Sequence, residues 1–195
     1  MGLSEKVFNM MRLLLILTLT FSFQAWTIAD DIRDFQIEGI SVGDSALDFY
    51  TKEKITKYYK DWYEPKYSVA SIEEQRGIYD EIQLVYERND AQYKIVAISA
   101  LKYSDMKFCN IKMDEVSDEI LNIFGKDVKK SKKKTINHRS DKSGKSKVTD
   151  IFFKLKKDKD EIVVACYDWS KKMEYWDNLR ISIRSSSYTK YLNNL

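Results

Sequence analysis

The sequence has little of what most catalytic and metal-binding sites require. It contains one histidine, His138, and two cysteines, Cys109 and Cys166, and it lacks a Gly-x-Ser-x-Gly motif. A Ser-His-Asp hydrolase would have to use His138, which lies in a basic, loop-like stretch and is a poor base. A zinc site needs more histidine and cysteine than this chain offers. We therefore predict no catalytic residue, no metal site and no cofactor, which favours a non-enzymatic protein without excluding an enzyme.

Proline, glycine and an excess of one charge are also scarce. The chain has one Pro and six Gly, and its 33 Lys+Arg nearly balance its 30 Asp+Glu. A nearly balanced total charge argues against a protein that binds nucleic acid over its whole surface. Lys, Ile, Asn, Asp and Tyr are abundant, as AT-rich codon usage produces, so the lysine count alone says little about function.

The only long apolar run is near the N-terminus, at residues 13–23, after Lys6 and Arg12. It is too short to span a bilayer of about 30 Å comfortably, which takes roughly 20 residues. The order of positive start, apolar run and small residue predicts a signal peptide over residues 1–29, cleaved near Ala29. The alternative is an uncleaved membrane anchor. We expect a periplasmic or secreted protein in which residues 30–195 form a single α+β domain with no transmembrane span.

Export permits a disulfide between the two cysteines. Cys109 falls on one helical stripe with Met113 and Ile120, and Cys166 shares one strand face with Val164. Both thiols should therefore point toward the same core. We predict the Cys109–Cys166 disulfide; the alternative is two buried free thiols.

Hydrophobic periodicity divides the chain into helices and strands. A helix capped near Ser45 is expected to run to about residue 62, where Pro65 prevents its continuation. A second helix covers 111–124 and ends at Gly125. Alternating apolar residues and turn signals predict strands, several joined as hairpins, at 66–72, 77–87, 92–103, 134–138, 148–156, 161–169 and 178–184. A short helix is expected over the last ten residues.

The order of helix followed by strands occurs twice, which suggests two related α–β–β halves. Hairpin connections imply an antiparallel sheet, and a βαβ rhythm is lacking. We therefore predict an α+β fold, with a mostly antiparallel sheet and helices packed on one side.

Gly144-Lys145-Ser146 has the ending of a nucleotide-binding P-loop. The first glycine of that motif is missing, because Arg139 stands in its place, and a strand rather than a helix comes next. The stretch is better interpreted as a turn between the strands at 134–138 and 148–156. The surrounding residues 126–147 contain ten Lys or Arg and only two acids. This segment is a candidate anion-binding patch, unless it is only a solvated loop, and its residues are Lys129, Lys130, Lys132, Lys133, Lys134, Arg139 and Lys145.

A second candidate site lies near the C-terminus, where Asp168, Trp169, Trp176 and Asp177 are close in sequence. Tryptophans beside acids can bind sugars or cations, and two carboxylates can act together in glycoside hydrolysis. The alternative is that the tryptophans belong to the core. These residues define two rival functions, an envelope-polymer hydrolase and a small-ligand binding protein.

Three stretches carry a resemblance to a known family: ADDIRDFQIEGISVGDSALDFY (29–50), DKSGKS (141–146) and CYDWS…DNLRISI (166–183). In these the chain resembles a family of uncharacterised short exported proteins of Pelagibacter-type marine bacteria, which implies a periplasmic location. Our leading hypothesis is a non-enzymatic domain that binds an envelope protein or an anionic envelope surface. Its contacts would come from the basic segment or from Arg180 and Arg184, which the strand pattern directs outward. We do not expect nucleic acid as a partner, because the basic segment lacks aromatic residues to stack bases.

Overall fold

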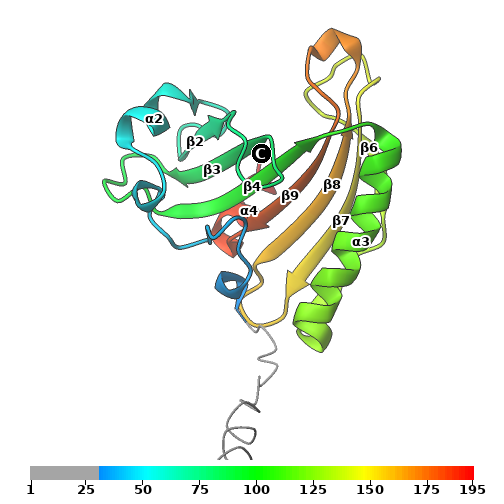
Figure 1. Cartoon of the computed structure of the whole chain (residues 1–195), viewed down its shortest axis with the longest axis horizontal. Helices are drawn as coiled ribbons and strands as arrows, with labels where there is room; N and C mark the ends of the chain where they lie inside the picture. The colour runs from blue at the N-terminus through cyan, green and yellow to red at the C-terminus, as the bar shows by residue number, and fades with distance from the viewer. Residues whose placement is uncertain (1–30) are drawn as a thin grey trace, which may run out of the picture.

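Nine strands form one twisted sheet in the computed structural model, which describes residues 31–195 (Figure 1). The strand order is β1-β2-β3-β4-β9-β8-β7-β5, and β6 pairs with the same edge of β7 as β5 does. Every pairing is antiparallel. The strands are β1 (Tyr59–Lys60), β2 (Tyr67–Ile72), β3 (Glu81–Glu87), β4 (Ile95–Tyr103), β5 (Val128–Lys130), β6 (Lys134–Asn137), β7 (Lys147–Leu155), β8 (Glu161–Asp168) and β9 (Asn178–Arg184).

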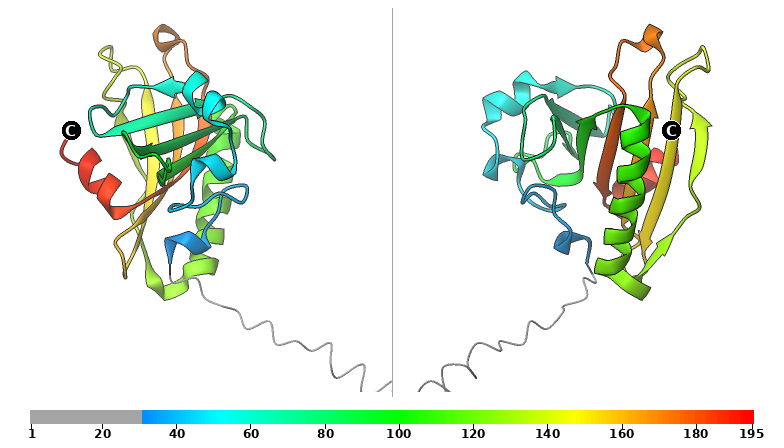
Figure 2. Two further views of the ribbon diagram at one scale, coloured as in Figure 1. Left: turned by 90° about the vertical axis from the view of Figure 1, so that its left-hand side faces the viewer. Right: turned by 45° about the vertical axis from the view of Figure 1, so that its right-hand side comes forward.

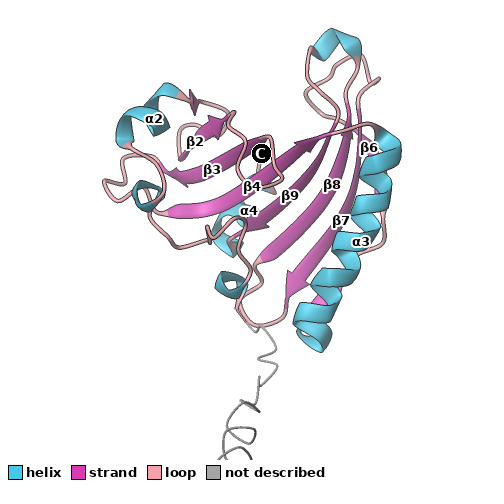
Figure 3. Ribbon diagram, in the orientation of Figure 1, coloured by secondary structure: helices cyan, strands magenta, loops and turns pink. Residues whose placement is uncertain are grey.

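Three α-helices accompany the sheet within the described residues: α2 (Lys52–Lys57), α3 (Met106–Phe124) and α4 (Ser186–Leu192) (Figure 3). Short 3-10 turns occur at Ile32–Asp34, Ala46–Asp48, Gly125–Asp127 and Lys171–Met173. The predicted α+β class with a mostly antiparallel sheet is confirmed.

Along the chain, strands are added first from one edge of the sheet and then from the other, and the last strand, β9, lies in the middle. Hairpins join β2, β3 and β4, and α3 then carries the chain to the far edge, where β5 and β6 pair with β7. Two further hairpins return through β8 to β9, and β9 pairs with β4 along seven residues. The two helix-then-strand halves therefore meet at the β4–β9 pair.

Helix α3 begins at a side-chain cap and ends at a glycine. Asp105 accepts a hydrogen bond from the backbone N–H of Phe108 at 2.8 Å, and Gly125 comes next after the helix with a φ of +50°, a value that favours glycine. The helix begins five residues before the predicted segment, because the cap lies at Asp105. Its buried stripe contains Cys109, which forms the predicted disulfide with Cys166 of β8 across a Cα–Cα distance of 5.9 Å. The bridge fastens α3 to the sheet.

The predicted helix from Ser45 to about residue 62 is broken into three elements. Ser45 does act as a cap, but its hydroxyl also donates to the carbonyl of Gln92 at 2.6 Å, so this turn is held against the start of β4. Helix α2 instead begins after Thr51 and is only six residues long. Tertiary contacts to β4 outweigh the local helical pattern at this point.

The two faces of the sheet are covered differently. One face, which we call the core face, packs against α2, α3 and the segment 31–46, and carries the main hydrophobic core. The opposite face, the outer face, carries α4 over β2, β3 and β4. Figure 2 shows α3 and α4 on opposite sides of the sheet. The expectation of helices on one side therefore holds for α2 and α3, and α4 departs from it.

The predicted signal peptide, residues 1–29 with cleavage near Ala29, lies outside the described residues. Within residues 31–195, no helix combines the length and the apolar character needed to cross a bilayer.

Candidate functional site

The loop between β6 and β7 is organised around the carboxylate of Asp141, which is almost fully buried. It accepts hydrogen bonds from the backbone N–H and the hydroxyl of Ser143 and of Ser146, at 2.6–2.9 Å. These bonds, led by those from the two hydroxyls, hold the pKa of Asp141 far below its usual range. Gly144 completes the loop with a φ of +69°. The Gly144-Lys145-Ser146 stretch is thus a turn built on Asp141, as the turn chemistry predicts.

Asp141 also connects this loop to the β8–β9 connection. The hydroxyl of Ser170 donates to the Asp141 carboxylate at 2.8 Å, and the backbone N–H of Ser170 donates to the Ser146 hydroxyl at 2.9 Å. The two segments that the sequence offers as separate candidate sites, 126–147 and 168–177, therefore touch each other.

Aromatic side chains extend this contact. The ring of Trp169 lies 4.4 Å from that of His138, 5.5 Å from that of Tyr167 and 4.9 Å from that of Tyr175, measured between centroids. The guanidinium of Arg180 lies 4.4 Å from the centre of the Tyr167 ring, a cation–π contact. We call His138, Tyr167, Trp169 and Tyr175 the loop cluster. It lies at the end of β8 where the chain turns toward β9.

The loop cluster is open to solvent on one side. Tyr175 is 57% exposed, and its neighbour Trp176 is 74% exposed, so these two rings are available for contact. His138 is half-buried, and its pKa lies below the usual value because of burial and then because of the nearby Arg180 and Arg139. The imidazole is therefore held neutral near pH 7.

The predicted anion-binding residues extend from the loop cluster along the β5–β6 edge of the sheet. Residues 129–137, which include β6, are all exposed. Lys133 pairs with Asp114 of α3 at 2.9 Å, and the ammonium of Lys130 lies 5.7 Å from the centre of the Phe153 ring. We call residues 129–147 together with the side chains 167, 169, 175 and 176 the basic–aromatic surface. The exposed members of the predicted patch are Lys129, Lys130, Lys132, Lys133, Lys134, Arg139 and Lys145.

Of the second candidate site, the structure brings together Trp169 and Asp177 but leaves Asp168 and Trp176 on the surface. The Asp177 carboxylate accepts a hydrogen bond from the backbone N–H of Trp169 at 2.7 Å, which fixes the β8–β9 connection. Asp168 is exposed at the end of β8. Neither carboxylate lines either of two hollows found in residues 31–195. Asp177 thus has a bond that holds the β8–β9 connection in place.

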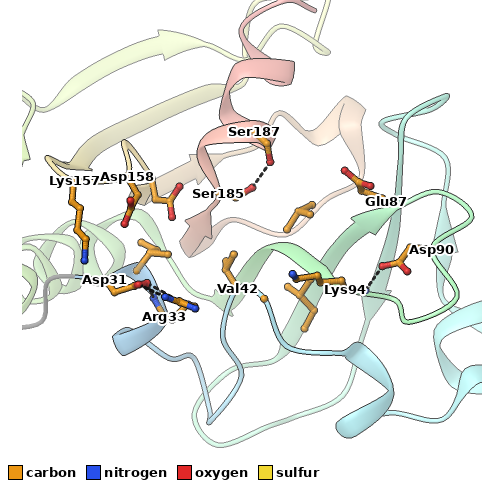
Figure 4. Close-up of a pocket in the computed structure, with 15 residues that line it drawn as sticks. Asp31, Arg33, Val42, Glu87, Asp90, Lys94, Lys157, Asp158, Ser185 and Ser187 are labelled. Carbon is orange, nitrogen blue, oxygen red and sulfur yellow. Dashed lines mark hydrogen bonds and ion pairs between the residues drawn. The ribbon is translucent and has the colours of Figure 1, made fainter.

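A hollow of about 610 Å³ lies at the opposite end of β8 from the loop cluster (Figure 4). The segment 31–43, the start of β4, the turn 157–160 and the start of α4 line it. Its polar groups largely serve the fold: Asp31 binds Arg33, and Asp160 accepts from the backbone N–H of Ser186 at 2.6 Å, which starts α4. Within residues 31–195, no three His, Cys, Asp or Glu side chains lie close enough to hold a metal ion.

Sequence reasoning named Arg180 and Arg184 as outward residues of β9, and the register places them on the outer face. It did not name Tyr167 or Tyr175, nor His138 as an aromatic partner. Alternation in 161–169 could have shown that Tyr167 points outward, because its neighbours Ile162, Val164 and Cys166 point inward.

Comparison with protein-family models, with curated proteins and with solved structures finds no match for this chain.

Proposed function

We propose that this protein is an exported, non-enzymatic domain that binds a negatively charged partner in the cell envelope through its basic–aromatic surface. The observation that carries the proposal is the contact between the two candidate segments. The Asp141–Ser170 hydrogen bond places exposed aromatic rings beside the β6–β7 loop, which ends a segment of ten basic residues. Basic side chains attract an anionic partner, and aromatic rings add contact area at little entropic cost.

Two features support a location outside the cytoplasm. A disulfide closes α3 onto β8, and such bonds persist in oxidising compartments such as the periplasm. The predicted leader over residues 1–29 and the resemblance to short exported proteins agree with this compartment. We therefore place the partner in the envelope, where lipid headgroups and acidic proteins supply negative charge.

Ring contacts and hydrogen bonds already engage the groups of this surface that could act as bases, which supports a binding role. His138 contacts two aromatic rings, and its Nδ1 accepts from the backbone N–H of Ser140 at 3.3 Å. Asp141 is saturated by serine donors, so it has no free lone pair for a proton transfer. The groups that could act as bases thus hold the surface in place.

The experiment compares binding by residues 30–195 to two anionic probes, poly-L-glutamate and phosphatidylglycerol vesicles. A triple variant, Lys132→Gln, Lys142→Gln and Lys145→Gln, removes three charges from the surface. The matched control removes three exposed charges near α2 with Lys52→Gln, Lys57→Gln and Lys60→Gln.

We expect the first variant to bind about tenfold more weakly and the control to bind as the unmodified protein does. Binding should weaken as salt rises, because ions screen exposed charges beyond about 10 Å at 0.1 M. Equal losses in both variants would show that total charge decides binding, and the surface would then have no special role. No binding to either probe at low salt would refute the proposal.

A further inference from the structure

Strand β6 is the outermost strand at its edge of the sheet. Among the described residues it pairs only with β7, and all four of its residues are exposed. Helix α3 packs over β8 and β9 and leaves β6 uncovered. The right-hand view of Figure 2 shows β6 at the margin of the molecule, beside β7. This edge is therefore open to solvent.

The phase of the ladder decides which backbone groups of β6 are free. The backbone N–H of His138 donates to the carbonyl of Ser146 at 2.9 Å, which makes these two residues a hydrogen-bonded pair. Hydrogen-bonded pairs alternate along an antiparallel ladder, so Ile136 and Lys134 also bond to β7. The N–H and C=O groups of Thr135 and Asn137 must then point away from the sheet. Within residues 31–195, no hydrogen bond occupies them.

Charge disfavours a second copy of this chain at that edge. Edge strands with unpaired backbone groups can pair with one another, and lysines along the edge prevent it. Here Lys132, Lys133 and Lys134 lie at the start of the strand and Arg139 follows it, so two copies paired antiparallel would bring the lysines of one near Arg139 of the other. An acidic strand meets no such repulsion, because its carboxylates would lie opposite the lysine ammonium groups.

The outer face offers an apolar contact beside the same edge. Ile136 is 43% exposed, and its register partner Val148 belongs to a small hydrophobic cluster with Val163 and Ala165. An apolar side chain on an added strand would cover Ile136 and extend this cluster across the edge. His138 lies on the same face two residues further along, so the loop cluster continues the contact.

We propose that β6 accepts an acidic, extended segment of a partner protein as an additional strand of the sheet. This inference rests on the proposed function and specifies the partner as a polypeptide. Backbone hydrogen bonds to Thr135 and Asn137 supply affinity that does not depend on sequence. Acidic residues that face the lysines, and an apolar residue next to Ile136, supply selectivity.

Proline substitutions test the strand addition directly. Thr135→Pro removes an outward N–H and leaves the ladder to β7 intact, and proline is tolerated at such edge positions. The side chain of Thr135 also bonds to that of Thr149, at 2.8 Å, so Thr135→Val is the matched control that keeps the N–H. Asn137→Pro with Asn137→Ala is a second, independent pair. The probe is a Glu-rich peptide of about ten residues with one Val at its centre, because Lys134 and Ile136 lie on the same face of β6. Poly-L-glutamate is the anion that lacks the apolar residue.

We expect each proline variant to bind the Glu-rich peptide about tenfold more weakly, while each control binds it as the unmodified protein does. In the unmodified protein, hydrogen exchange at the Thr135 and Asn137 amides should slow when the peptide is added. Equal binding by proline and control variants, with no slowing of exchange, overturns the inference. If poly-L-glutamate still binds in that case, the proposed function survives.

If one proline variant loses its cooperative thermal transition, the other proline–control pair is used instead. Hydrogen exchange in the unmodified protein tests the strand addition without any substitution. A peptide with Lys in place of Glu should not bind, because it meets the lysines with like charge. Tight binding of that peptide would contradict the assigned chemistry of the partner. No binding of any anion would refute the inference and the proposed function together.

Discussion

Two aromatic clusters lie on the outer face of the sheet, and they have opposite environments. In the first, Tyr67 of β2 packs edge-on against Tyr188 and Tyr191 of α4, with ring centroids 5.2 and 5.0 Å apart. Helix α4 seals this tyrosine cluster, and Tyr67 and Tyr188 are almost completely buried. The loop cluster around Trp169 has no such cover. The same class of side chain closes a core in one place and forms an open surface in the other.

The difference comes from where α4 lies on the outer face. After β9 the chain turns into α4, because Asp160 and the Ser185 hydroxyl satisfy its first backbone N–H groups. That helix lies across β2, β3 and β4, and among residues 31–195 no other helix covers the outer face of β7 and β8. The loop cluster thus lies on a part of the outer face that α4 does not reach.

The largest expected effect comes from opening the Cys109–Cys166 disulfide, which fastens α3 to β8. The chain-entropy model gives about 4 kcal/mol for closing a loop of this length, where the cysteines are 57 residues apart. Cys109→Ala with Cys166→Ala should lower the free energy of unfolding by about that amount, as measured by urea denaturation. The unmodified protein in reductant is the control. A change below about 1 kcal/mol would show that packing of α3 alone holds this region together.

The second prediction compares the two clusters themselves. Tyr188→Ala should cost about 3–5 kcal/mol, because it removes a buried ring and leaves a cavity under α4. Tyr175→Ala should cost less than about 1 kcal/mol, because that ring is mostly exposed. Urea denaturation of both variants measures the difference. Equal costs would remove the distinction between a structural and a surface cluster.

The fold was largely predictable because its strands carry a local signal. Alternation of apolar residues identified seven strands. Gly125 indicated where α3 ends, and the faces that carry Cys109 and Cys166 indicated the disulfide. The short strands β1 and β5 were missed, since two or three residues give no period to detect. The break of the predicted helix after Ser45 was also missed, because a bond to Gln92, 47 residues away, causes it.

The candidate site was predictable in its parts but not in its assembly. Composition identified the basic segment, and proximity in sequence identified the Trp and Asp residues. The two parts are joined by the bond between Asp141 and Ser170, which are 29 residues apart, and by the contact of His138 with Trp169. Such contacts depend on how the β6–β7 loop and the β8–β9 connection meet at one end of the sheet, which no local pattern encodes.

The third prediction concerns pH and the loop that joins the two segments. Asp141 has a strongly lowered pKa in the folded protein, so its contribution to stability is fully present above the pKa of an unfolded aspartate, about 3.9. That contribution is lost as pH falls below this value toward the folded pKa. Asp141→Asn should therefore show a shallower loss of stability from about pH 5 to pH 2 than the unmodified protein, measured by urea denaturation at each pH.

Asp168→Asn is the control for this measurement, because it removes an exposed carboxylate from the same region. It should retain the steep acid loss of the unmodified protein. If Asp141→Asn and Asp168→Asn gave the same pH profile, Asp141 would not be the group that couples the loop to pH.

The smallest expected effect on stability is at Trp176, the most exposed ring of the basic–aromatic surface. Trp176→Ala should change the free energy of unfolding by no more than about 0.5 kcal/mol, because almost no contact is lost. The same substitution should weaken binding of the anionic probes severalfold, since exposed aromatic rings at a binding surface lose contact area when truncated. Trp62→Ala is the matched control, because that ring is 46% exposed but lies before β2, away from the surface. If both variants bind equally well, the lysines alone carry recognition, and the open cluster differs from the sealed one only in its exposure.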